Sequence, residues 1–164
     1  MTLTVLQQKV AEAHGLALAA AALTLKVDEH VDDAELAYLL HGMHRDAEAT
    51  RDRCLLAERG FGGELATELL QHANSTHQRV LDLVGAWFKA GTDALSAWSF
   101  LAMSEAGEVA TWSSVASLAA RSDEPALVEL AAWALPVQDR HLQATLSGAV
   151  RLAEAFEAAQ PRWG

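Results

Sequence analysis

Two glutamates, Glu105 and Glu108, stand three residues apart in a stretch that otherwise has the apolar stripe of a buried helix. Apolar side chains continue this stripe on both sides of the pair, at Leu101 and Trp112. Burying a carboxylate without a partner is costly, so a helix that turns two carboxylates inward usually gives them a cation or another polar group. Glu105 and Glu108 are therefore the first candidates for a metal site inside a helical bundle.

Two other predicted helices interrupt their apolar stripes in the same way. In the last helix the interrupting residue is His141, and Gln138 lies one turn before it in a Q-x-x-H step. In the second helix His44 and Glu48 border the stripe four residues apart. Interruptions near the middle of three helices indicate that these polar groups meet. We therefore expect a carboxylate–histidine metal site with the following ligands: Glu48, Glu105, Glu108, His141 and His44.

Each of these residues also has an ordinary structural explanation. A glutamate at the edge of a stripe is often half-exposed, and a single inward histidine is often a hydrogen-bonded core residue. Glu48 could equally pair with Arg45 or Arg51 on its own helix. If Arg51 points inward, its guanidinium could take the place of a cation beside the carboxylates.

Helical periodicity extends over nearly the whole chain, and no strand pattern competes with it. The glycine-rich RGFGG ends the second helix, Thr92 or Asp93 caps the fourth, and Ser122 is expected to cap the fifth, with Pro125 near its first position. Long helices joined by short links form an antiparallel bundle. The five expected helices span residues 3–27, 33–58, 64–89, 93–120 and 123–158, in a single all-α domain of residues 1–158 with a C-terminal tail at 159–164.

The composition argues against several classes of partner. The chain has 164 residues, a formal net charge of −10 and one cysteine. Nucleic acids and anionic membrane surfaces are not expected partners, because both require clustered lysine and arginine. Cys54 cannot form an internal disulfide, and we expect it to be buried and inert in a reducing cytoplasm.

The apolar run GLALAAAALTL at residues 15–25 is predicted to be part of a buried helix. It is shorter than a membrane span, and Glu12 and His14 before it do not fit a signal peptide. We therefore expect a cytoplasmic protein without a membrane partner.

With these elements in place, the sequence resembles the ferritin-like superfamily, and within it the bacterial stress-associated proteins of the YciF type. The resemblance covers about residues 5–155 and rests on SEAGEVATW (104–112), QDRHLQATL (138–146) and DAEATRDRCLLAERGFG (46–62). It implies an antiparallel four-helix bundle with an additional crossover helix. It also implies a di-iron or manganese site whose ligands come from glutamates and from E-x-x-H steps. It also implies metal binding or weak redox chemistry connected with stress, and a homodimer.

The sequence departs from that family pattern at two positions. Gln138 stands where the last helix would carry a glutamate, and Glu48 is followed by Arg51 where the second helix would carry a histidine. The remaining groups suffice for one metal ion and are marginal for two. We therefore expect a reduced or degenerate site of iron or manganese, with no catalytic residue assigned.

Two alternatives remain open at this stage. A haemerythrin- or DinB-like metal bundle would use the histidines of HGMH (41–44) and HANSTH (72–77), although a spacing of five residues does not put His72 and His77 well on one helix face. A non-catalytic helical protein would act through dimerisation or partner binding. Five tryptophans could mark its core layers or its interface, at positions 87, 98, 112, 133 and 163.

Overall fold

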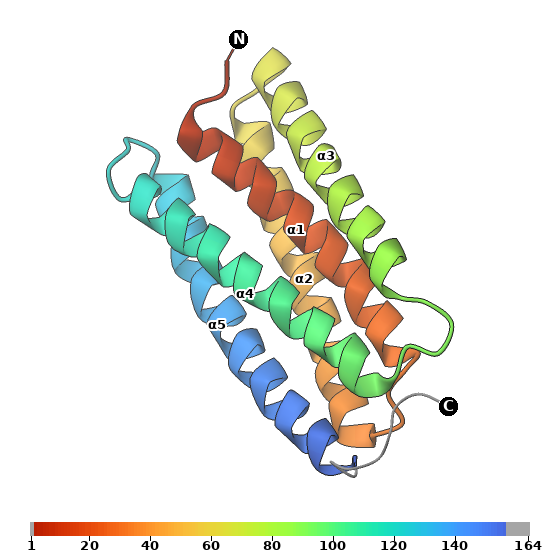
Figure 1. Cartoon of the computed structure of the whole chain (residues 1–164). Helices are drawn as coiled ribbons and strands as arrows, with labels where there is room; N and C mark the ends of the chain where they lie inside the picture. Colours follow the sequence, from red (N-terminus) through yellow and green to blue (C-terminus); the bar gives the residue numbers. More distant parts are fainter. Residues whose placement is uncertain (1, 157–164) are drawn as a thin grey trace.

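The computed structural model describes residues 2–156, which form five α-helices and no strand (Figure 1). The all-α prediction is confirmed, and each predicted end lies within a few residues of the observed one. Residue 1 and residues 157–164 are outside the described part, and with them the predicted tail and Trp163. The helices are α1 (Val5–Asp28), α2 (Ala34–Gly60), α3 (Gly63–Trp87), α4 (Ala94–Ala119) and α5 (Pro125–Glu154).

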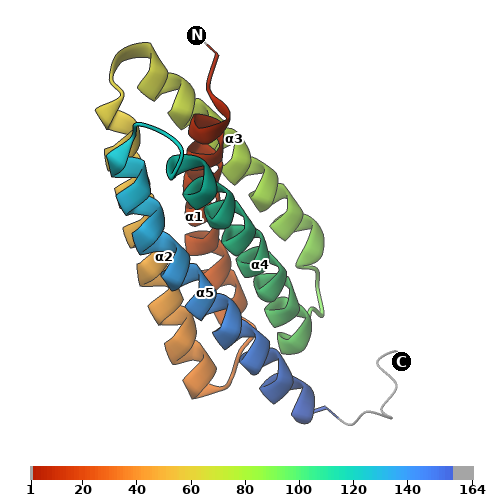
Figure 2. The same ribbon diagram turned by 90° about the vertical axis from the view of Figure 1, so that its left-hand side faces the viewer.

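Consecutive helices run in opposite directions (Figures 1 and 2). Four of them, α1, α2, α5 and α4, surround a common core, and each contacts the next around the ring. The third helix packs mainly on α1, outside this ring, and leads the chain from the end of α2 to the start of α4. As a result α2 and α4 run in parallel, although every sequential pair is antiparallel.

The first helix contacts three others, α2, α3 and α4. By length and composition alone, its 24 residues could cross a membrane. The apolar run at 15–25, on which the sequence prediction rests, is shorter than this helix. In the bundle, however, 61% of its most apolar window is buried. This is also the pattern of a central core helix.

Two glycines allow helices to approach closely. A Cβ on Gly15 of α1 would lie 2.4 Å from the carbonyl oxygen of Ala73 in α3. A Cβ on Gly148 of α5 would lie 2.5 Å from the ring of Trp98 in α4, whose indole N–H donates to the carbonyl of Thr145 at 2.7 Å. No larger residue fits at either crossing without displacement of its neighbour.

The helix starts were predicted with mixed success. Asp93 caps α4, accepting a hydrogen bond from the backbone N–H of Ser96 at 2.7 Å. Pro125 opens α5 as expected, but the prediction that Ser122 caps this helix is wrong. The hydroxyl of Ser122 donates to the carbonyl of Ala119, because Ser122 belongs to the turn that ends α4.

The apolar core consists of two clusters that a layer of polar side chains separates. One cluster contains Cys54 of α2 and Trp112 of α4, and the other contains Met43 of α2 and Leu101 of α4. Between these levels lie buried residues that belong to neither cluster, and we call this set the polar layer. Its members are Thr50, Glu105, Glu108, Gln138 and His141.

Candidate functional site

The polar layer is built mainly by the facing surfaces of α4 and α5. Glu105, Glu108 and Gln138 are each 1% exposed, and His141 is 5% exposed. Residues three apart share a helix face, so each helix contributes two neighbouring polar groups. The Nδ1 atom of His141 lies 3.6 Å from Oε2 of Glu105. Because the helices are antiparallel, this pairing puts Gln138 at the level of Glu108.

His141 connects the layer to the surface. Its Nε2 atom lies 2.9 Å from Oδ2 of Asp46 on α2, and the Asp46 side chain is 37% exposed. A groove of about 280 Å³ between α2 and α5 is lined by both residues and by Arg140, whose guanidinium also contacts Asp46 at 3.3 Å. The imidazole therefore lies between an outer carboxylate and an inner one, with a different ring nitrogen toward each.

The surroundings shift the pKa values of His141 and Glu108, and both shifts reduce the net negative charge of the polar layer. Burial lowers the pKa of His141, but the carboxylates of Glu105 and Asp46 outweigh burial and leave the pKa raised. Burial raises the pKa of Glu108 well above its ordinary value, and the neighbouring charge of Glu105 adds to this. The layer thus favours a charged imidazole beside Glu105 and a neutral carboxyl at Glu108.

Several oxygens in the layer nevertheless make no hydrogen bond to any described residue. They are Oε2 of Glu105, both carboxylate oxygens of Glu108 and Oε1 of Gln138. The 3.6 Å separation between His141 and Glu105 is too long for a hydrogen bond, so we treat this contact as electrostatic only. Buried polar atoms without a partner cost about 1–3 kcal/mol each, and proteins usually satisfy them with water or an ion.

The two ligands predicted on α2 lie outside this layer. Nδ1 of His44 is 2.9 Å from the carbonyl of Ala21, so this ring faces α1. The Glu48 side chain is 45% exposed and lies near His44 and Arg51. The helix turns Thr50 and Cys54 to the core, and the directions of His44 and Glu48 diverge from this face toward α1 and solvent.

Arg51 does not enter the layer either. Its side chain is 33% exposed, and its Nε atom donates to Asp52 at 2.8 Å. Its guanidinium also lies 3.6 Å from Glu48. The guanidinium therefore does not occupy the place of a cation beside Glu105 and Glu108.

A second buried acid–imidazole pair was not predicted. His14 of α1 and Glu58 of α2 are 3% and 0% exposed, and their Nδ1 and Oε2 atoms lie 2.8 Å apart. Glu58 follows Thr50 and Cys54 at steps of four residues, which is the signal that it continues the inward stripe. The predicted second helix ends at residue 58, and no role for Glu58 is predicted from the sequence.

The donor set does not fit a two-metal centre. Within residues 2–156, no group of three or more His, Cys, Asp and Glu side chains is arranged to hold a metal ion. The buried atoms of the layer that lack a partner, on Glu105, Glu108 and Gln138, are all carboxylate or amide oxygens. Oxygen donors of this kind suit a single hard cation such as Mn²⁺.

Cys54 is fully buried, as predicted. Burial raises the pKa of its thiol well above the ordinary value, and the carboxylates of Glu58 and Glu108 add to the effect. The thiolate is the nucleophilic form of cysteine, so this environment disfavours nucleophilic attack by Cys54.

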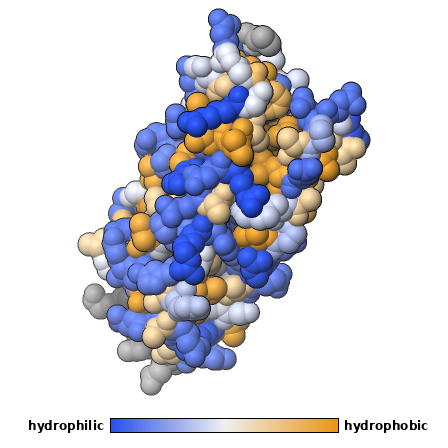
Figure 3. All heavy atoms as spheres, turned by 180° about the vertical axis from the view of Figure 1, so that it is seen from behind, coloured by the Kyte–Doolittle hydropathy of each residue, from blue (hydrophilic) through white to orange (hydrophobic). Residues whose placement is uncertain are grey.

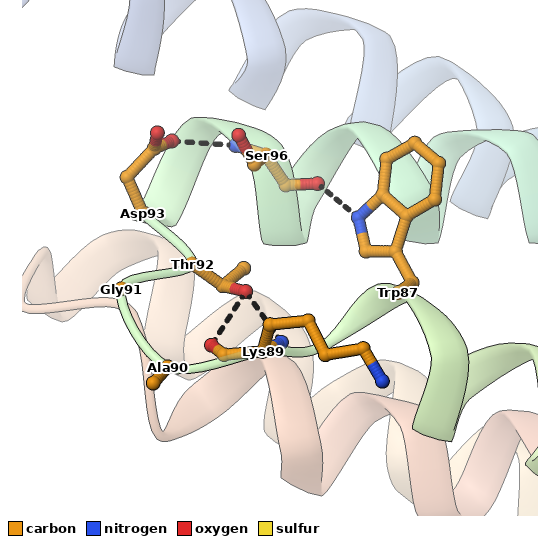
Figure 4. A pocket seen from close by; sticks show the side chains of 7 residues that line it. All are labelled: Trp87, Lys89, Ala90, Gly91, Thr92, Asp93 and Ser96. Atoms are coloured by element: carbon orange, nitrogen blue, oxygen red, sulfur yellow. Dashed lines mark hydrogen bonds between the residues drawn. The ribbon is translucent and has the colours of Figure 1, made fainter. Parts of the chain in front are cut away.

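A hollow of about 440 Å³ lies at the turn between α3 and α4, and its polar groups are engaged in local structure (Figure 4). The indole of Trp87 donates to the carbonyl of Ser96, and the Thr92 hydroxyl bridges the N–H and carbonyl of Lys89. Gly91 supplies the positive φ of 87° that this turn requires. These contacts close the turn and provide no set of catalytic groups.

Comparison with known proteins identified no relative of this chain. It matched no protein-family model, no curated protein and no solved structure.

Proposed function

We propose that this protein is a ferritin-like helical bundle that binds one divalent cation, manganese or iron, at Glu105 and Glu108. The observation that carries the proposal is that both carboxylate oxygens of Glu108 are buried and without a hydrogen-bond partner among the described residues. A cation at this position would satisfy these oxygens and would also offset the repulsion between the two carboxylates.

The arrangement of the helices supports the ferritin-like part of the proposal. Two helix pairs surround the core, and α3 carries the chain between them, as the sequence resemblance implies. The departures at Gln138 and Arg51 favour one ion over two. Glu105 and Glu108 would hold the ion, the amide oxygen of Gln138 would be a third donor, and water would complete the coordination. The bound ion would supply a positive charge and, for iron or manganese, weak redox capacity.

His141 and Asp46 would control access to the site. The groove between α2 and α5 is lined by both residues and would be the route by which solvent and a cation approach the layer. A protonated His141 beside Glu105 competes electrostatically with a cation, so we expect cation binding to release a proton.

The competing candidate is a structural polar network in a protein that acts by association. His141 already contacts carboxylates with both ring nitrogens, and a neutral Glu108 would remove the excess charge. This network would need no cation. The two candidates differ in whether the folded protein binds a metal ion at all.

The test is titration of chelator-treated protein with Mn²⁺, measured by calorimetry and by thermal unfolding. We expect one ion per chain and stabilisation of about 2.7 kcal/mol at a free concentration about 100 times the dissociation constant. Glu108→Gln should abolish both effects. Glu48→Gln is the matched control, because Glu48 lies outside the polar layer and should leave binding unchanged.

Two results would count against the proposal. One is a folded wild-type protein that neither releases heat nor gains stability with Mn²⁺ or with anaerobic Fe²⁺, which would favour the structural network. The other is retention of binding in Glu108→Gln, which would place the cation elsewhere.

A further inference from the structure

The outer face of α2 carries the two most exposed large apolar side chains of the described residues. Tyr38 is 75% exposed and Leu56 is 74% exposed. They are 18 residues apart, which in an α-helix is about five full turns and about 27 Å. Both side chains therefore leave the helix in the same direction, opposite to the face that Ala47 and Cys54 turn to the core.

The positions between them form a continuous stripe with alternating steps of four and three residues. This is the spacing of a coiled-coil seam, in which one helix packs along another. None of the side chains in the stripe is buried. The residues of this α2 stripe are Tyr38, Gly42, Arg45, Ala49, Asp52 and Leu56.

We propose that the α2 stripe binds the same stripe of a second copy of this chain, with the two helices antiparallel about a two-fold axis. The stripe is symmetric about its midpoint, so each of its positions meets another position of the stripe. Tyr38 faces the partner's Leu56, Gly42 faces the partner's Asp52, and Arg45 faces the partner's Ala49. An apolar pair thus closes each end, and each inner layer sets a small residue against a large one.

Charges on one edge of the stripe are complementary in this register. Arg45 is exposed and makes no ion pair with any residue from 2 to 156. The register puts it next to the partner's Glu48, whose side chain is 45% exposed. The two-fold axis produces this contact twice. Since each chain has a net charge of −10, such local pairing is needed to offset general repulsion between copies.

Grooves beside the stripe offer space for the apolar ends. One groove of about 310 Å³ is lined by Leu56, Ala57 and Leu130, and the groove of about 280 Å³ is lined by Tyr38 and Met43. The partner's Tyr38 would lie against the first groove and the partner's Leu56 against the second. Figure 3 views the molecule from behind and shows apolar patches among hydrophilic side chains on that side.

Gly42 provides a separate indication of close approach. A Cβ at this position would meet no atom within 4 Å, so the isolated chain has room for a larger residue. Glycine in the middle of a helix costs roughly 0.5–1 kcal/mol relative to alanine. Contact with a second backbone at this point would explain why a small residue is useful there.

The first test is sedimentation of the full-length protein and of two variants, Gly42→Gln and Leu56→Gln. We expect a wild-type dimer, and in each variant a dissociation constant raised about tenfold or more, because every substitution occurs twice in the interface. Gly107→Gln is the matched control: like Gly42, Gly107 lies in mid-helix with no atom within 4 Å of a Cβ, but it is on α4. It should dimerise like the wild type, and circular dichroism should show all variants folded.

The second test addresses the register. Tyr38→Cys and Leu56→Cys proteins should form an intermolecular disulfide when mixed and far less when each is oxidised alone. A monomeric wild-type protein, unchanged dimerisation in Gly42→Gln, or self-crosslinking of each single variant would each overturn the proposal. Measurements with and without Mn²⁺ separate this interface from the proposed cation site.

Discussion

The imidazole of His14 and the carboxylate of Glu58 form a buried contact of 2.8 Å between Nδ1 and Oε2, although 44 residues separate them in the chain. The pair joins α1 to the last turns of α2. The other carboxylate oxygen of Glu58 has no hydrogen bond within the described structure. His14 is therefore the main polar support for a fully buried carboxylate.

Replacing His14 by alanine should destabilise the protein by about 3–5 kcal/mol, because it leaves the Glu58 carboxylate buried without its partner. Equilibrium unfolding in urea measures this loss. Glu29→Gln, which breaks an exposed pair with Lys26, is the control and should leave the unfolding midpoint nearly unchanged. Equal effects of the two substitutions would show that the buried pair contributes no more than a surface one.

Glu108 should make the metal-free protein less stable as pH rises. Its folded-state pKa lies well above the ordinary 4.5, so its stabilising contribution is fully present below pH 4.5 and is lost as pH rises through the folded-state pKa. Glu108→Met should remove this dependence and stabilise the metal-free protein at neutral pH by about 1–4 kcal/mol. Unfolding free energies at several pH values, with chelator present, test both statements. An unchanged pH dependence in the variant would assign the titration to another group.

Much of the fold could be predicted because helical periodicity and helix-end signals are local. The stripe that contains Leu101 and Trp112 fixes which face of α4 is buried, and therefore predicts that Glu105 and Glu108 point inward. The same argument applies to His141 on α5. All three are buried, as this reasoning requires.

The partners of these residues could not be predicted in the same way. Successive helical residues differ by about 100° in direction, so His44 and Glu48 diverge from the inward face of α2 although they border its stripe. Which exposed carboxylate meets His141 depends on how α5 is set against α2, and this register selects Asp46. Contacts between helices depend on how the whole bundle packs. The apolar stripe of one helix does not determine which residues of the other helices it meets.

Asp46 should hold His141 in its charged form. The pKa of His141 is lowered by burial but raised overall by the nearby carboxylates, so its stabilising contribution is complete below pH 6.5 and is lost as pH rises through the folded-state pKa. Asp46→Asn should lower the pKa of His141, measured by nuclear magnetic resonance titration of the histidine ring. Asp139→Asn, at an exposed position on α5, is the control and should not change it. A pKa that stays the same in Asp46→Asn would mean that Glu105 alone sets it.

The contact between α1 and α3 should depend on the absence of a side chain at Gly15. A Cβ there would lie 2.4 Å from the carbonyl oxygen of Ala73 and 2.7 Å from the Cβ atom of Thr76. The first of these neighbours is backbone in the middle of a helix, so it cannot move aside as the end of a flexible side chain could. Gly15→Ala must therefore displace α3 from α1, and we expect a loss of about 1–3 kcal/mol from overpacking.

The matched substitution Gly42→Ala should have the opposite sign in the monomer. Nothing lies within 4 Å of a Cβ at Gly42, so the change should stabilise α2 by roughly 0.5–1 kcal/mol through helix propensity. Unfolding of both variants in urea under monomeric conditions gives the comparison. Hydrogen exchange adds a local readout, because Gly15→Ala should reduce protection in α3 more than in α5, which does not pack on α3. Equal protection losses in both helices would indicate general destabilisation and not the displacement of α3.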